Sequence, residues 1–368
     1  MAGSQDRWLV YVGAHGKGPE TGVYAYAMDP ASGALEYLSR FTGVDNTLFL
    51  TLSPERRYLY TVHGHGKVTD EPNGTVNAFA VDQRTGELTW LNRQTSYGTT
   101  PCHLTTDQTG RYLFVANFRG VGGVPSRGSV SAIRIEEDGR LGEATDVVQH
   151  PGSSVHPERQ TASHPHSNTV DPSNRFVIVA DLGIDRLMVY QLDLATGKLI
   201  PAERPSVEIA PETGPRHFAF HPSGKYAYVI TEISDEIIVF SYDESRGALR
   251  QIQAVSTLPP DFEGRNMPAD VQVLPSGKFV YGTNRGHDSI AIFAVDEHTG
   301  ELRAAGYQPI DEGTPQNLAL DPTGTFLLSA NEKGNNVTVF RIDPQTGGLE
   351  DTGHRIEVPM PLCVHLVV

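Results

Sequence analysis

Short runs of alternating hydrophobic and polar residues recur along the chain, each ending at turn residues. The clearest example lies between Pro215 and Gln251, where residues 217–222 alternate and residues 225–231 alternate again. Aromatic or β-branched side chains at every second position predict half-buried strands. A third strand is expected at residues 236–242 and a fourth, short one after Leu249. The pattern therefore predicts a unit of four antiparallel strands.

This unit recurs seven times. Each copy contains an Asp or another polar residue, two variable residues and Gly-x-Leu, with one extra Gly before Leu349 in the last copy. The repeated glycines are Gly33, Gly86, Gly139, Gly197, Gly247, Gly300 and Gly347, separated by 53, 53, 58, 50, 53 and 47 residues. A period of about 50 residues with four strands per unit is typical of a β-propeller. We predict an all-β fold, a seven-bladed propeller that forms one domain over residues 1–368.

A second recurring turn joins the first two strands of each unit. In the fifth copy it reads Pro-Ser-Gly-Lys, and its counterparts fall at Pro54, Gly110, Asn174, Gly277 and Gly324. Asn174 is an acceptable substitute because Asn tolerates positive φ better than most non-Gly residues.

The two ends of the chain complement each other. The first unit begins at Trp8 with a second-strand sequence and has no first strand before it. Residues 361–366 resemble the first strand at residues 315–320, with no second strand after them. The C-terminal strand is therefore predicted to complete the N-terminal blade and close the ring, which removes an open sheet edge.

The charge balance narrows the classes of partner. The chain has 29 basic and 44 acidic side chains, a net charge of −15, and 38% hydrophobic residues, as expected for a globular protein. Nucleic-acid binding is disfavoured because affinity for phosphate backbones comes mainly from clustered Lys and Arg. No apolar run approaches the roughly 18 residues of a membrane span, and no basic segment leads into an apolar stretch near the N-terminus. A cytoplasmic protein without membrane contact is expected.

The two cysteines exclude a disulfide framework and a four-cysteine zinc site. Cys102 and Cys363 are expected as buried thiols on equivalent positions of two first strands.

Propeller geometry predicts which polar residues meet. In every blade, the start of the first strand and the end of the second strand lie on the same face, so the residues there gather at one mouth of the central channel. These residues are His103, Asn117, Arg216, His217, Glu232, Asn317, Asn331 and the segments 163–166 and 284–287. Acidic residues lie instead in blade-end turns, such as those after Asp29, Asp243 and Asp343. A locally cationic mouth is expected despite the negative net charge.

Several segments together resemble a known family over essentially the whole chain. They are Arg159 and Gln160, SHPHS at 163–167, ADLGIDRLMVY at 180–190, GPRHFAFHPSGKYAYVITE at 214–232, GKFVYGTNRGHDSIAIF at 277–293 and DPTGTFLLSAN at 321–331. The chain resembles the lactonase family of seven-bladed propellers, which includes bacterial 6-phosphogluconolactonases of propeller type and fungal carboxymuconate cyclases.

The resemblance implies an activity and a site. The activity is hydrolysis of a sugar-acid lactone, with 6-phosphoglucono-1,5-lactone, opened to 6-phosphogluconate in the pentose phosphate pathway, as the first substrate to try. The active-site set of the cyclase branch matches His166, Arg216, Glu232 and Arg285. Departures from the family are Pro165 where Ala is common, Gln316 where Arg is common, and a longer segment at 118–127.

The side chains suit this chemistry. Glu232 is the candidate base that activates a water, and Arg216 and Arg285 are bidentate donors for a carboxylate, phosphate or oxyanion. His166 could polarise the carbonyl or shuttle a proton. The residues expected to bind a small anionic sugar lactone are His103, His164, His217, Asn284 and His287. No cofactor, metal or covalent nucleophile is expected.

Plainer interpretations of these residues stay open. Glu232 and Arg285 could form a structural ion pair, and His217 and His221 could line the channel. The pairs His164/His166 and His63/His65 are spaced to bind a metal, although no third ligand is evident. Asp181 and Asp185 are expected to cap turns, and residues 120–128 are expected to form a rim loop and not a phosphate loop, because no helix follows.

Two other classes of function also stay open. One is a cyclase or lyase that acts on an unsaturated dicarboxylate through the same His, Arg and Glu residues. The other is a propeller that serves only as a protein-binding platform, for which exposed aromatic patches on the rim would be the sign. The sequence leaves the oligomeric state open between monomer and dimer.

Overall fold

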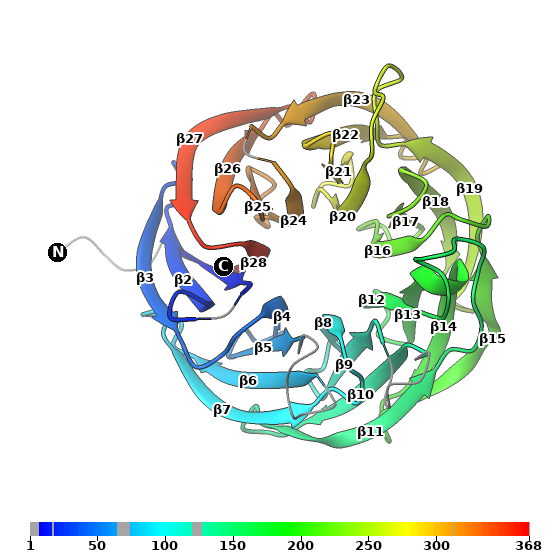
Figure 1. Ribbon diagram of the computed structural model, residues 1–368, viewed down its shortest axis with the longest axis horizontal. Coiled ribbons are helices and arrows are strands. Elements are labelled where there is room, and N and C mark those ends of the chain that lie inside the picture. Colours follow the sequence, from blue (N-terminus) through cyan, green and yellow to red (C-terminus); the bar gives the residue numbers. More distant parts are fainter. Residues whose placement is uncertain (1–6, 17, 65–73, 120–126, 312, 368) are drawn as a thin grey trace.

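Seven four-stranded antiparallel sheets form a ring of blades, with the first strand of each blade innermost (Figure 1). This is the computed structural model of the chain, and it describes residues 7–16, 18–64, 74–119, 127–311 and 313–367. The seven-bladed all-β propeller predicted from the sequence is confirmed. No helix in these described ranges is long and apolar enough to cross a membrane.

The blades are numbered in chain order. Blade 1 is β28 (Pro361–Val367), β1 (Trp8–Ala14), β2 (Gly22–Met28) and β3 (Leu35–Phe41). Blade 2 is β4 (Thr47–Leu52), β5 (Tyr58–His63), β6 (Thr75–Val81) and β7 (Leu88–Thr95). Blade 3 is β8 (Pro101–Thr106), β9 (Tyr112–Asn117), β10 (Ser129–Ile135) and β11 (Leu141–Gln149). Blades 4 and 5 are β12 (Pro165–Val170), β13 (Phe176–Asp181), β14 (Arg186–Asp193), β15 (Lys198–Glu208), and β16 (Pro215–Phe220), β17 (Tyr226–Thr231), β18 (Glu236–Asp243), β19 (Ala248–Ser256). Blades 6 and 7 are β20 (Met267–Val273), β21 (Phe279–Arg285), β22 (Ser289–Val295), β23 (Leu302–Pro309), and β24 (Pro315–Leu320), β25 (Phe326–Asn331), β26 (Asn336–Ile342), β27 (Leu349–Glu357).

Two details of the predicted unit are wrong. The first strand of blade 5 begins at Pro215, two residues before the predicted start, because a strand tolerates proline at its first residue, where no ladder N–H is needed. The fourth strand, β19, has nine residues and is not short, as expected of an outer strand that spans the wider periphery of a blade.

The ring closes as predicted. In blade 1, β28 pairs antiparallel with β1, from Leu9 opposite Val367 to Ala14 opposite Pro361. In Figure 1 the blue N-terminal strand lies beside the red C-terminal strand on the inner side of this blade. The contact covers the free edge of β1 and joins the two ends of the chain.

The repeated glycines mark the places where neighbouring blades touch. All seven have positive φ, between 64° and 82°. Tyr60 of β5 donates a hydrogen bond to the carbonyl of Gly139 in the next blade (3.2 Å), and Tyr228 bonds Gly300 in the same way (3.1 Å). A Cβ at Gly139 would lie 2.2 Å from the ring of Tyr58, so only glycine fits this turn without a shift of the ring.

The turn between the first two strands also has the predicted conformation. Asn174 has φ 58°, like Gly110, Gly224 and their glycine counterparts, so the prediction for Asn174 is confirmed. In blade 2 the equivalent residue is Arg56, with φ 61°.

The hydrophobic core is divided among the spaces between blades. Alternate side chains of the inner strands face the neighbouring blade. One cluster, for example, joins Tyr60 and Val76 of blade 2 to Leu104, Val115 and Ile133 of blade 3.

A β-bulge near the start of every innermost strand positions the mouth of the channel. In blade 5, Pro215 pairs with Thr231 and His217 with Ile230, so Arg216 is the extra residue. The other six blades show the same shift of register. The extra residues, called here the first layer, are Leu48, Cys102, His166, Arg216, Ala269, Gln316 and Leu362. The residues that follow them, called the second layer, are Phe49, His103, Ser167, His217, Asp270, Asn317 and Cys363.

The expectation that the two cysteines occupy equivalent positions is wrong. Cys102 belongs to the first layer and Cys363 to the second, because the strand in blade 1 pairs Pro361 with Ala14 and Cys363 with Gly13. Cys363 is buried, whereas Cys102 is partly exposed.

Ring closure gives a stability prediction. Val364 of β28 is 3% exposed in the core between blades 7 and 1, so Val364→Asp should lower the free energy of unfolding by about 3 kcal/mol. The matched control is Val147→Asp on outer strand β11, where the side chain is 38% exposed and the change should cost less than about 1 kcal/mol. Urea unfolding measures both values, and equal losses would contradict the closing role of β28.

Candidate active site

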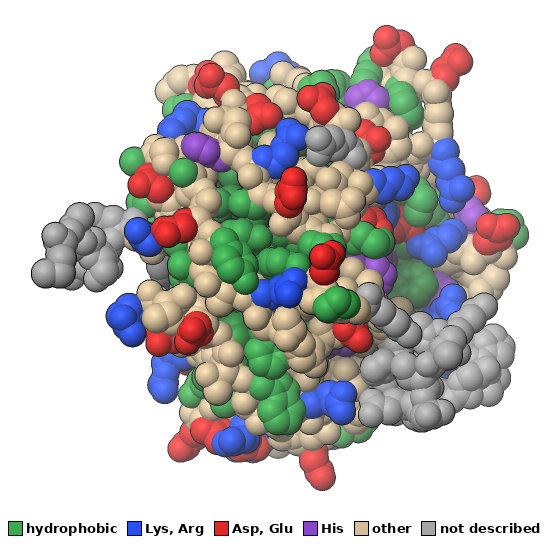
Figure 2. Space-filling view, turned by 60° about the vertical axis from the view of Figure 1, so that its left-hand side comes forward, with side chains coloured by type: hydrophobic (Ala, Val, Ile, Leu, Met, Phe, Trp, Pro, Cys, Tyr) green, Lys and Arg blue, Asp and Glu red, His purple; other side chains and the backbone are tan. Residues whose placement is uncertain are grey.

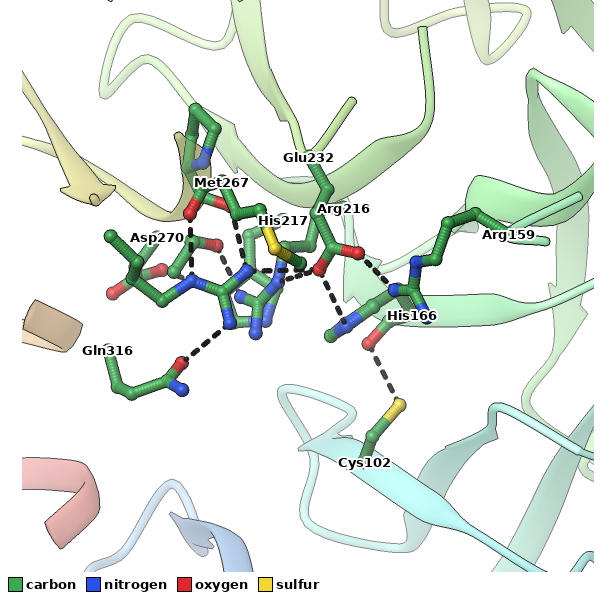
Figure 3. Close-up of polar contacts among 12 residues, drawn as sticks. Cys102, Arg159, His166, Arg216, His217, Glu232, Met267, Asp270 and Gln316 are labelled. Carbon is green, nitrogen blue, oxygen red and sulfur yellow. Dashed lines mark hydrogen bonds and ion pairs between the residues drawn. The ribbon is translucent and has the colours of Figure 1, made fainter. Parts of the chain in front are cut away.

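Four residues named from the sequence meet at one mouth of the channel, and Figure 3 labels three of them, His166, Arg216 and Glu232. His166 and Arg216 are first-layer residues of β12 and β16. Glu232 directly follows β17, and Arg285 is the last residue of β21. A bulge turns a side chain away from the regular alternation of the strand, which is how His166 and Arg216 come to face Glu232.

Glu232 is the centre of this group. Its Oε2 lies 3.1 Å from Nε of Arg216 and 3.1 Å from Nη2 of Arg285, and its Oε1 accepts a hydrogen bond from Arg159. The side chain is 3% exposed. Burial alone would raise the pKa of Glu232, but the charges of Arg216, Arg285 and Arg159 outweigh burial and lower the pKa to about 2. The carboxylate is therefore ionised at neutral pH.

The guanidinium groups are held by the backbone as well. Arg285 donates from Nε to the carbonyl of Met267 (2.8 Å) and from Nη2 to that of Pro268 (3.3 Å), and Arg216 donates to the carbonyl of Ala269. Three consecutive carbonyls of β20 thus orient two arginines. Burial and the nearby Arg285 lower the pKa of Arg216 to about 10, so it stays charged at neutral pH.

His166 is the fourth member of the group around Glu232. Its Nε2 lies 3.9 Å from Oε2 of Glu232, while its Nδ1 is buried without a hydrogen-bond partner in the described structure. Burial and the charge of Arg216 lower the pKa of His166 well below its usual range, so the imidazole is neutral at pH 7. Cys102 donates to the carbonyl of His166 (Sγ···O 3.3 Å), which ties β12 to β8 at this level.

A polar belt lies directly below, in the second layer. Nδ1 of His217 is 2.8 Å from Oδ1 of Asp270, and Oδ2 of Asp270 accepts hydrogen bonds from Nδ2 of Asn317 (2.7 Å) and from the N–H of Leu318 (2.9 Å). Nδ1 of His103 accepts a bond from the N–H of Asn168 (3.4 Å). Each of these bonds joins neighbouring blades. The predicted residues His103 and His217 therefore lie beneath the arginine group.

The other three predicted substrate-binding residues have different surroundings. His164 stacks on Phe118 with ring centroids 4.2 Å apart, and Phe118 also contacts His166, so His164 lies behind the group. Asn284 is fully buried and donates to the carbonyl of Thr257. His287 bonds Ser289 and packs on Phe262.

Asn284 and His287 are not brought to Glu232. Side chains alternate along β21, so Asn284 points away from the side that Arg285 occupies, and the turn after Gly286 directs His287 outward against Phe262 and Tyr307.

Three residues around the site were given no role from the sequence. Arg159 comes from the segment between β11 and β12, and only its place in the family resemblance marked it. Asp270 could have been found by register, since it occupies the position equivalent to His217 one blade later. Gln316 bridges Nη1 of Arg285 (3.5 Å) and a carboxylate oxygen of Glu332 (2.6 Å).

Two aspartates have the turn-capping geometry expected of them. Asp185 has φ 51° and accepts hydrogen bonds from the N–H groups of Thr213 and Gly214. Asp181 accepts hydrogen bonds from the N–H groups of Gly183 and His164, and its Oδ2 lies 2.6 Å from Nδ1 of His150.

The pairs His164/His166 and His63/His65 are candidate metal ligands by their spacing. Within the described ranges, no group of three or more His, Cys, Asp or Glu side chains is close enough to hold a metal ion. His65 and most of the 120–128 segment lie outside the described residues, so the predictions for them stay predictions.

The surface charge contrasts with the mouth. Figure 2 shows acidic and basic side chains scattered over one side of the molecule. Asp29, Asp243 and Asp343 each accept N–H donors of their own blade-end turn, as predicted. At the mouth, three arginines surround one buried glutamate, so positive charge exceeds negative charge within this group of four residues.

The fold and this mouth define a class: a seven-bladed propeller whose channel opens on a buried group of arginine, glutamate and histidine. The chain belongs to the family described as lactonase, 7-bladed beta-propeller, whose model matches residues 9–366. It is 36% identical to a 6-phosphogluconolactonase of Bacillus subtilis over 80% of each chain, and 32% identical to one of Formosa agariphila over 83% of each. The solved structure of a periplasmic gluconolactonase of Pseudomonas aeruginosa is similar with a TM-score of 0.91, 30% identity and 99% coverage of both chains.

The central position of Glu232 gives a second prediction. Glu232→Gln removes the negative charge between two buried guanidinium groups, so the free energy of unfolding at pH 7 should fall by about 3 kcal/mol. Glu87→Gln, an exposed control in the turn before β7, should change it by less than about 0.5 kcal/mol. Because the lowered pKa of Glu232 stabilises the folded state only while the carboxylate is ionised, the difference should shrink as pH falls from 4.5 toward 2. Equal free energies of unfolding for Glu232→Gln and the wild type at pH 7 would show that Glu232 does not stabilise the buried arginines.

Proposed function

We propose that the protein is a lactonase that hydrolyses a sugar-acid lactone, and that 6-phosphoglucono-1,5-lactone is its substrate. The observation that supports this most strongly is the mouth itself, where Glu232 orients three arginines and leaves them with an excess of positive charge beside a neutral imidazole. Such a group suits an anionic substrate that develops a further negative charge on an oxygen as it reacts. The names of the relatives point to the same substrate class.

The reaction needs no covalent intermediate. A water attacks the lactone carbonyl, and the resulting oxyanion is stabilised by the guanidinium groups of Arg216 and Arg285, which the carbonyls of β20 already hold in place. The bond from the carbonyl carbon to the ring oxygen then breaks, and the ring oxygen takes a proton to become a hydroxyl group. His166 lies beside this carbonyl position and hydrogen-bonds the reacting groups.

The geometry changes the role proposed for Glu232. A carboxylate whose pKa is about 2 has little affinity for a proton at neutral pH, so it is a weak base. Glu232 is therefore proposed to position the arginines, and an imidazole is proposed to accept the proton.

A substrate panel tests the activity. We expect turnover of six-membered sugar-acid lactones, with kcat/KM about tenfold higher for 6-phosphoglucono-1,5-lactone than for glucono-1,5-lactone, because a phosphate adds a charge-assisted interaction at a cationic mouth. A titration of the released acid, corrected for spontaneous opening, measures the rates. Equal rates on both lactones would contradict the phosphorylated substrate, and no turnover of any lactone would contradict the lactonase.

Arg285→Ala tests the site. Loss of a guanidinium that contacts Glu232 and faces the mouth should lower kcat/KM by roughly 100-fold. Arg303→Ala removes an exposed arginine from outer strand β23 and serves as the matched control. Similar activities of the two variants would place the reaction elsewhere.

The remaining alternatives stay proposals. A lactone-forming cyclase would use the same residues on an unsaturated dicarboxylate, so muconates belong in the panel. A location in the cytoplasm stays a prediction, and one relative is described as periplasmic. Whether the protein is a monomer or a dimer also stays open.

A further inference from the structure

One buried carboxylate–imidazole pair has no part in the chemistry described above. Asp270 and His217 lie in the second layer, beneath Arg216, with side chains 3% and 7% exposed. Burial would raise the pKa of Asp270, but the hydrogen bonds that its side chain accepts from His217, the N–H of Leu318 and Gln272 outweigh burial and lower the pKa, so Asp270 is a carboxylate. A carboxylate at Nδ1 holds the ring proton there and leaves Nε2 of the neutral His217 as an acceptor.

The His217 ring contacts the reacting end of the site. Its centroid lies 5.5 Å from that of His166, with the ring planes at 65°, and 5.3 Å from that of His103. None of the described hydrogen bonds of His217 or of His166 uses Nε2, and Nε2 of His166 lies 3.9 Å from Oε2 of Glu232. Two neighbouring imidazoles therefore each have an Nε2 atom available to a water.

His166 is the less suitable of the two as a proton acceptor. An imidazole that takes a proton becomes a cation, and the carboxylate nearest to His166, Glu232, is 3.9 Å away and already bound to three arginines. His217 has a carboxylate in direct contact at 2.8 Å. An imidazolium at His217 is thus stabilised where one at His166 is not.

We propose that His217 is the general base of the hydrolysis, that Asp270 is its positioning residue, and that the attacking water is held between His217 and His166. This inference rests on the proposed lactonase function. His217 takes a proton from the water as the water oxygen bonds to the lactone carbonyl carbon. When the bond from that carbon to the ring oxygen breaks, the imidazolium returns this proton to the ring oxygen. The product is a hydroxy acid, which then loses its acidic proton to solvent.

The competing account is purely structural. The same pair belongs to the belt that continues through Asn317, whose Oδ1 accepts a bond from the N–H of Val364. A residue needed only for the belt should affect stability and rate together.

The experiment compares His217→Ala with Asn317→Ala, which breaks the belt without removing the imidazole. For His217→Ala we expect kcat on the best lactone to fall roughly 100-fold and to recover in part, in proportion to concentration, when imidazole is added. Asn317→Ala should keep most of its kcat and gain nothing from imidazole. Urea unfolding of both variants checks that each is folded, and His217→Gln, which retains a polar side chain, replaces His217→Ala if the latter is unfolded.

The pH profile gives a second readout. Burial and Arg216 lower the pKa of His217 while Asp270 raises it, and the net effect is a lowered pKa. The base is active when neutral, so kcat/KM of the wild type should stay level as pH falls to 6.5 and decline only below it, and this decline should be absent in His217→Gln. The titratable and charged groups that face His217 are Arg216 of β16, Asp270 of β20, Arg285 of β21, Glu232 after β17, His103 of β8 and His166 of β12.

The outcomes separate the two proposals. Wild-type kcat in His217→Ala, or equal losses in His217→Ala and Asn317→Ala without rescue, would overturn the role of His217 while the lactonase stands. Absence of lactone turnover in the wild type would overturn both proposals.

Discussion

The fixed spacing between neighbouring blades is the constraint on which the rest of the molecule depends. Second-strand tyrosines such as Tyr60 and Tyr228 bond the repeated glycine of the next blade, and a side chain at that glycine would strike an aromatic ring. With β28 added to blade 1, the ring closes and every innermost strand starts at the same mouth. Arg285 and Arg159 are 53 and 73 positions from Glu232 in the sequence, and both can therefore contact it.

The bulge in each innermost strand gives the site its two layers. It adds one residue per blade, so the first layer holds Arg216 and His166 and the second holds His217 and Asp270. The first layer concentrates positive charge around one carboxylate, and the second layer links blades through hydrogen bonds. Both layers are fixed before any substrate arrives, which favours stabilisation of a charge that develops only during the reaction.

The blades and the closure of the ring could be predicted from the sequence because the same strand pattern occurs seven times, so a weak signal in one copy is supported by the others. The glycine period predicted seven blades, and the unmatched ends predicted how they close. The mouth residues His166, Arg216, Glu232 and Arg285 followed from strand ends together with the family resemblance. What the sequence missed depends on single-residue register and on loops: a bulge separates Cys102 from Cys363, and side-chain alternation directs Asn284 away from its neighbour Arg285. Arg159 reaches Glu232 from a segment without periodicity.

We propose that the arginine group at the mouth binds the carbonyl end of a sugar lactone and the carboxylate of its ring-opened product. The most direct measurement is a crystal structure with the product analogue 6-phosphogluconate bound. We expect its carboxylate on Arg216 and Arg285, within reach of His166 and one layer above His217. A carboxylate bound elsewhere, with the guanidinium groups still committed only to Glu232 and the carbonyls of β20, would contradict it.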